Sequence, residues 1–131
     1  MISNFVRASA IVAIISGVSA PAFAAPDDYV FEPVNAEVKR GDDAVVAVRL
    51  KHQPSGKPVT DAIIVVKRID MGPDGMAEMA SPLEPVPSRE PGVYAFKTEL
   101  SMAGRWQLSL AARVQGEPQM VVGKVTFRAT R

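Results

Sequence analysis

The sequence predicts an all-β domain, an immunoglobulin-like antiparallel β-sandwich of about seven strands without a disulfide. Three observations lead to this prediction. Apolar residues recur at every second position in several short runs, which is the period of a half-buried strand. Gly, Pro and Asp separate these runs, and beyond residue 24 no run has the period of an amphipathic helix. The chain contains no cysteine, so no disulfide can join the two sheets.

The segment 1–24 has the features of a secretory signal peptide. Arg7 lies near the amino terminus, an uncharged apolar segment follows, and Ala22-Phe23-Ala24 fits the small-x-small rule for signal peptidase. The apolar segment is shorter than the ~20 residues that a membrane-spanning helix needs. We therefore expect cleavage after Ala24 and a periplasmic or secreted domain over 25–131, which is tied to a membrane only if the segment is retained.

The charge balance of the expected domain limits its partners. The chain has 15 basic and 14 acidic residues, and Arg7 is the one basic residue before position 25. This even balance does not provide the basic surface that nucleic acids require, so no nucleic-acid partner is expected. Without disulfides the domain depends on its core, and about a hundred residues suffice because such a sandwich buries roughly 60–70% of its unfolded surface.

The first four predicted strands cover 28–33, 35–41, 44–53 and 59–69. The first two are short and weakly patterned. The third is a half-buried strand, because apolar residues at 46, 48 and 50 alternate with Ala47, Arg49 and Lys51. The fourth is a continuous run rich in β-branched residues, which predicts a more deeply buried strand.

The last three predicted strands cover 92–100, 104–114 and 120–129. Each alternates apolar residues with polar or charged ones, so that one face points to the core. The residues expected to form much of the core are Val48, Leu50, Ile64, Tyr94, Phe96, Trp106, Leu108, Val125 and Phe127.

The segment 72–91 breaks this pattern. Its five prolines each remove a backbone donor that a central strand would need, so it is predicted to be a long loop without strands. Loops of this length are uncommon in compact domains and often carry function.

Two motifs follow this loop. Pro91-Gly92-Val93-Tyr94 and the segment 100–106 (LSMAGRW), together with the Met-rich segment 70–79, resemble the YtkA-like family and the related FixH-like proteins. The likeness extends over roughly 34–127. It implies a small exported or membrane-tethered β-sandwich of a kind that also occurs fused to efflux adaptors and near copper-handling genes. Independently of any family, Pro91 and Gly92 suit a type II turn.

Catalysis is not expected, so we predict that the protein is not an enzyme. The chain has one histidine, His52, and no cysteine. A catalytic triad would combine His52 with Asp61 or Asp70 and a serine, but no serine lies in a nucleophile-elbow sequence. No Gly-rich phosphate-binding loop precedes a helix.

A metal site is the sharper functional hypothesis. Met71, Met76 and Met79 lie close together in the sequence, and thioethers are soft ligands that select Cu(I). We therefore predict a copper site formed by Met71, Met76 and Met79, joined by His52 if the fold brings it near. The alternative is that these methionines fill the core, since methionine adapts well to irregular gaps.

With such a copper site, the protein is expected to be an exported accessory protein that binds copper or a related soft metal, or that assists a membrane transport or assembly complex for the metal. The alternative function is a structural docking module of a membrane-associated complex, without a metal site. Exposed sheet edges accept partner strands, and Met-rich surfaces fit irregular apolar partners. A metal site requires the sulfur atoms to converge on one point, whereas docking requires an exposed apolar surface.

Overall fold

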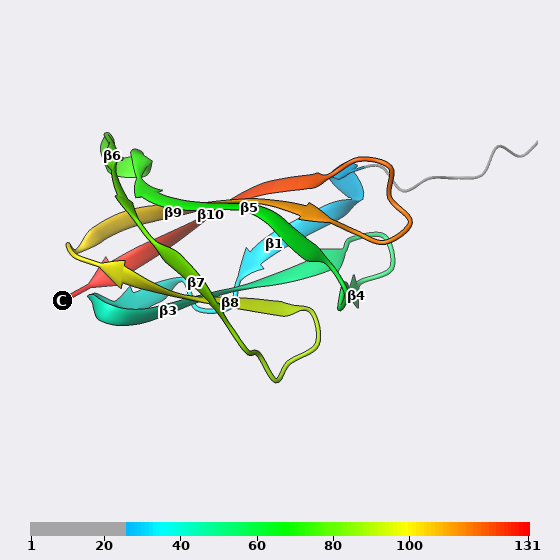
Figure 1. The fold of residues 1–131 in the computed structure, drawn as a ribbon, viewed down its shortest axis with the longest axis horizontal. Coiled ribbons are helices and arrows are strands. Elements are labelled where there is room, and N and C mark those ends of the chain that lie inside the picture. The colour runs from blue at the N-terminus through cyan, green and yellow to red at the C-terminus, as the bar shows by residue number, and fades with distance from the viewer. Residues whose placement is uncertain (1–25) are drawn as a thin grey trace, which may run out of the picture.

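The computed structural model describes residues 26–131, which form two five-stranded sheets (Figure 1). The first sheet has the order β1 (Tyr29–Pro33), β3 (Gly41–His52), β8 (Val93–Leu100) and β7 (Leu83–Val86), with the short β4 (Lys57–Pro58) also paired to β3. The second has the order β2 (Glu37–Lys39), β10 (Val121–Thr130), β9 (Gly104–Arg113), β5 (Ile63–Met71) and β6 (Met76–Ser81). Two 3-10 helices, η1 (Pro26–Asp28) and η2 (Gly72–Asp74), complete the described elements.

The predicted signal peptide and its cleavage site lie outside the described residues. Within 26–131, no helix is long and apolar enough to cross a membrane.

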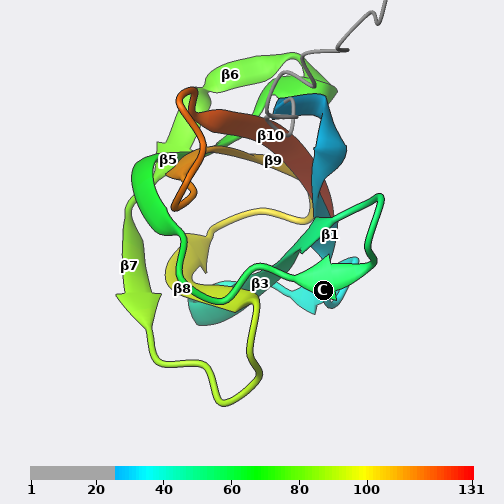
Figure 2. The ribbon, with the colours of Figure 1, turned by 90° about the vertical axis from the view of Figure 1, so that its right-hand side faces the viewer.

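The strand order confirms the predicted immunoglobulin-like sandwich. Every pairing is antiparallel except that of β2 with β10, which is parallel. The sheet formed by β1, β3, β8 and β7 corresponds to the first sheet of an immunoglobulin domain, and β10, β9 and β5 correspond to its second sheet. Figure 2 shows the two sheets as separate layers, with β9 and β10 in one and β3 and β8 in the other.

The core lies between these layers and agrees with the alternation in the sequence. The predicted core residues that are buried are Val48, Leu50, Phe96, Trp106, Leu108, Val125 and Phe127. The other two, Tyr94 and Ile64, are half-buried and pack against the core. The indole of Trp106 donates a hydrogen bond from Nε1 to the carbonyl oxygen of Met102 at 3.1 Å, so its one polar atom is satisfied inside the sandwich.

The prediction of a strand-free loop over 72–91 was wrong. The chain forms η2, pairs as β6 with the end of β5, and then crosses to the other sheet, where β7 pairs with β8. Pro82 lies at this crossing, and its carbonyl accepts a hydrogen bond from Thr98 Oγ1 at 2.7 Å. Pro85 is tolerated because β7 is an edge strand, where a missing donor on the free side costs nothing.

The predicted burial of the strand over 59–69 was also wrong in part. The strand begins only at Ile63, and Ile63, Val65 and Val66 are exposed. A register irregularity lies between Ile64 and Val66, so Val65 is an extra residue that breaks the alternation. This irregularity places two consecutive valines in solvent, which the sequence pattern alone did not indicate.

Candidate functional site

The structure brings the three candidate methionines to one end of the second sheet. Met71 ends β5, Met76 begins β6, and the two are Cα partners across the strand pair. Met71 is almost completely buried, with 1% of its surface exposed, and a Cβ on Gly104 would lie 2.6 Å from its methyl group. Met76 and Met79 are half-buried and pack against the core. All three therefore also act as packing residues.

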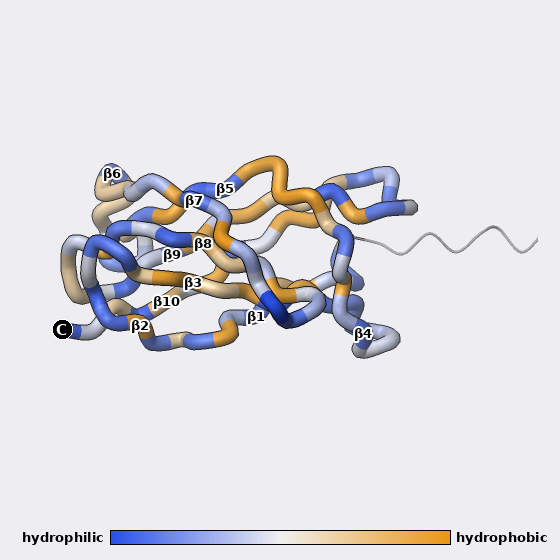
Figure 3. Tube along the Cα trace, turned by 60° about the horizontal axis from the view of Figure 1, so that its bottom comes forward, coloured by the Kyte–Doolittle hydropathy of each residue, from blue (hydrophilic) through white to orange (hydrophobic). Residues whose placement is uncertain are grey.

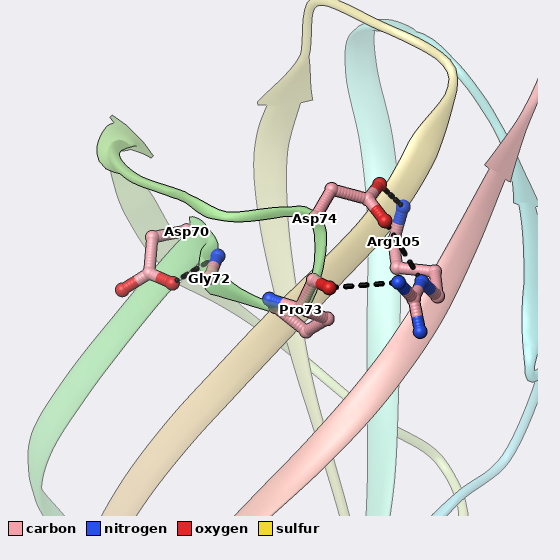
Figure 4. Close-up of polar contacts among 5 residues, drawn as sticks. All are labelled: Asp70, Gly72, Pro73, Asp74 and Arg105. Carbon is pink, nitrogen blue, oxygen red and sulfur yellow. Dashed lines mark hydrogen bonds and ion pairs between the residues drawn. The ribbon is translucent and has the colours of Figure 1, made fainter.

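Hydrogen bonds hold this Met-rich end in place (Figure 4). Asp70 accepts a bond from the backbone N–H of Gly72 and another from Arg68 Nε, both at 2.9 Å. Asp74 accepts bonds from the backbone N–H and the Nε of Arg105, at 2.7 and 2.8 Å. Arg105 also donates from Nη2 to the carbonyl of Pro73 at 2.7 Å. The connection between β5 and β6 is therefore clamped to β9.

The clamp has an electrostatic consequence. The backbone N–H and the guanidinium of Arg105 lower the pKa of the Asp74 carboxyl below its ordinary value, because both donate to its charged form. Asp74 is therefore ionised at neutral pH and pairs with Arg105.

The structure does not bring His52 to the methionines. His52 ends β3 and pairs with β4, and its Nδ1 lies 2.7 Å from Ser55 Oγ. Its ring also packs against Tyr29, with centroids 5.2 Å apart. Met71 lies beside Gly104 at the opposite end of the sandwich, where β8 turns into β9. Within the part of the chain that the structure describes, no three His, Asp or Glu side chains lie close enough to hold a metal ion.

Sequence reasoning missed a groove between the two sheets. It has a volume of about 330 Å³ and opens beside the half of β5 that β6 does not cover. Its lining residues are Ile64 and Lys67 of β5, Pro85 and Val86 of β7, Ser88, and Val93, Tyr94, Ala95 and Phe96 of β8. The two basic residues that follow the apolar run at 63–66 are the sequence signal for this exposed edge, although the run itself also has the pattern of a buried strand.

Tyr94 fixes the segment that leads into β5. Its hydroxyl donates to the carbonyl of Val59 at 2.8 Å and accepts from the backbone N–H of Ala62 at 3.0 Å. Burial raises the pKa of Tyr94 above its ordinary value, so the hydroxyl keeps its proton and can donate. The start of β5 is thereby tied to the wall of the groove.

Comparisons with known proteins place the chain in a family. A model of the YtkA-like family matches residues 23–111. Among solved structures, the ZirS C-terminal domain is 15% identical with a TM-score of 0.46, and the match covers 100% of this chain and 86% of that one. The adhesin InvE of Yersinia pseudotuberculosis is 17% identical with a TM-score of 0.44, and the match covers 80% of this chain and 27% of that one. No curated protein sequence matches.

Proposed function

Because the chain belongs to the YtkA-like family, we propose that it is an exported, non-enzymatic accessory protein that binds a component of a membrane transport or assembly complex. One observation supports this proposal above the others. Ile63, Val65 and Val66 are 64%, 50% and 51% exposed on a single strand, where a domain without partners would carry polar residues.

These side chains belong to a wider apolar surface on the outer face of the second sheet. Val66 on β5 is the Cα partner of Ala111 on β9, and Ala111 is the partner of Val122 on β10. Val122 is 71% exposed and Ala111 is 7% exposed, so exposed valines on β5 and β10 flank a small buried residue on β9. Figure 3 shows the hydrophobic colour on the half of β5 that lies away from β6. Several apolar side chains exposed on one face of a sheet are typical of an interaction surface.

Basic residues border the row of Val66, Ala111 and Val122. Arg113 follows Ala111 by two positions and Lys124 follows Val122 by two, so both share its face and both are exposed. A partner that matches this surface has an apolar centre and acidic residues around it. This charge complementarity speeds the encounter of the two proteins and orients them, more than it raises their affinity.

Photo-cross-linking tests the proposed function. When cells that produce the protein with a photoreactive residue at Val66 are irradiated, the protein should form a discrete adduct with one protein of a membrane transport or assembly complex. The matched control is Val45, which is 46% exposed on β3 in the other sheet and should give none. The absence of any adduct from Val66, or equal adducts from both positions, would contradict the proposal.

Binding of Cu(I) by Met71, Met76 and Met79 is a second candidate function. The pairing of Met71 with Met76 across an edge strand supports it, since thioethers held together suit a soft ion. His52 is not part of this proposal, because it lies at the other end of the sandwich.

A competition titration with a Cu(I) chelator tests this candidate. Replacing Met76 and Met79 with leucine preserves side-chain volume, and should weaken Cu(I) binding by at least ~10-fold if these sulfur atoms are ligands. Replacing the exposed Met102 and Met120 with leucine is the control and should leave binding unchanged. Equal affinity of wild type and the first variant would eliminate the metal site.

A further inference from the structure

One edge of β5 is free over most of its length. On one side, β5 pairs with β9 from Ile63 to Asp70. On the other side, β6 pairs with it only from Ile69 to Met71, and no other described strand joins it there. The backbone of 63–68 therefore lies at a sheet edge where another strand can be added.

The edge of β7, across the groove from β5, is not suited to pair with an added strand. On the far side of the groove, β7 is the edge strand of the first sheet. Pro85 lies within β7, and Pro87 follows its end. Both residues lack the backbone N–H that a pairing strand would need. An added strand is therefore directed to β5.

The two faces of an added strand would meet apolar surface. On the inner side lies the groove, whose lining includes the apolar and aromatic side chains of Ile64, Val86, Tyr94 and Phe96. On the outer side lie the exposed side chains of Val65 and Val66. Since successive residues of a strand point to opposite faces, a bound segment would bury apolar side chains on both.

The groove also has a charge preference. Lys67 is the one charged residue among the described residues that line it. Within 26–131 the ammonium group of Lys67 forms no hydrogen bond or ion pair, whereas the side chain of the adjacent Arg68 bonds to Asp70 and to the carbonyl of Ala77. An ammonium group beside an apolar groove and without an acidic neighbour in its lining is complementary to a carboxylate on the ligand.

We infer that β5 binds an extended apolar peptide segment of the partner protein by strand addition along 63–68, with an acidic side chain of that segment facing Lys67. This inference rests on the proposed function and specifies which part of the partner is recognised. Backbone hydrogen bonds to β5 supply affinity, and the groove and Lys67 supply selectivity. The free edge accommodates a segment of about six residues.

Fluorescence anisotropy with three synthetic peptides tests this inference on the purified protein. The first is a labelled eight-residue peptide of valine and threonine with one central glutamate. The second carries lysine in place of the glutamate, and the third keeps the glutamate but has N-methyl groups on alternate backbone amides. We expect saturable binding of the first peptide only, since the second reverses the charge and the third blocks strand pairing.

Two charge variants locate the binding site. Lys67→Glu should weaken the binding of the glutamate peptide at least ~10-fold and allow the lysine peptide to bind. Lys39→Glu makes the same change in net charge on β2, at the far side of the second sheet from β5, and should change the affinity for neither peptide by more than ~2-fold. Circular dichroism checks that both variants fold.

Each other outcome overturns the inference. The inference fails if the glutamate peptide does not bind at ~1 mM, or if the two charge variants have equal effects on binding. It also fails if the N-methylated peptide binds as tightly as the unmodified one. A cross-linked adduct from Val66 without any peptide binding would overturn strand addition alone and leave the proposed function intact. Peptide binding without a cross-linked adduct in cells would overturn the proposed function and leave strand addition to β5 intact.

Discussion

Replacing Trp106 with alanine should lower the free energy of unfolding by ~3–5 kcal/mol, the largest effect we expect from a single core substitution. The side chain of Trp106 is fully buried between the two sheets. Alanine would leave a cavity in this core and remove the hydrogen bond from Nε1 to the carbonyl of Met102. Urea denaturation followed by circular dichroism measures the loss.

Val122→Ala provides the control for this prediction. Val122 is 71% exposed on β10, so its truncation should change the free energy of unfolding by no more than ~0.5 kcal/mol. A loss below ~1 kcal/mol for Trp106→Ala would mean that the sandwich repacks around the missing ring, and that the core is less rigid than its burial indicates.

Gly92→Ala should be the most damaging substitution outside the core. Gly92 has a φ of +81°, where a side chain costs about 1–3 kcal/mol of backbone strain. A Cβ at this position would also lie 2.5 Å from the Cβ of Pro58, and forcing that contact costs roughly another 1–3 kcal/mol. The backbone at Gly92 cannot easily move away from Pro58, because the carbonyl of Gly92 accepts a hydrogen bond from the N–H of Leu50 at 2.9 Å.

Gly116→Ala separates these two causes. Gly116 has a similar φ of +87°, but a Cβ there would meet nothing within 4 Å. It should therefore show the backbone strain without the clash, and thermal unfolding should place Gly116→Ala between wild type and Gly92→Ala. Equal destabilisation of the two variants would show that the contact with Pro58 is relieved at no cost.

Gly92 also belongs to one of the two motifs that resemble the YtkA-like family. Pro91-Gly92-Val93-Tyr94 was part of the resemblance to the YtkA-like family, which the match over residues 23–111 confirms. In the structure these residues have local tasks: Gly92 fits against Pro58, and Tyr94 holds Val59 and Ala62. The motif supports the fold by shaping the wall of the groove.

The candidate site was only partly predictable. Met71, Met76 and Met79 are near in sequence, and a short 3-10 turn keeps Met71 and Met76 together as strand partners. Whether His52 joins them depended on the direction of β3 relative to β5, which no local pattern specifies. The sheet pairing places His52 beside β4 instead.

The sequence by itself determined the fold class and the inward face of most strands, because the side-chain period of a strand is two and the core must collect one face of each. Only the tertiary structure decided which strand edges are covered. An apolar run such as 63–66 has the same sequence pattern whether or not a neighbour pairs with it, and pairing depends on partners far away in the chain. Here β6 leaves β5 at Ile69 and crosses to the other sheet, so the rest of β5 stays open to a partner.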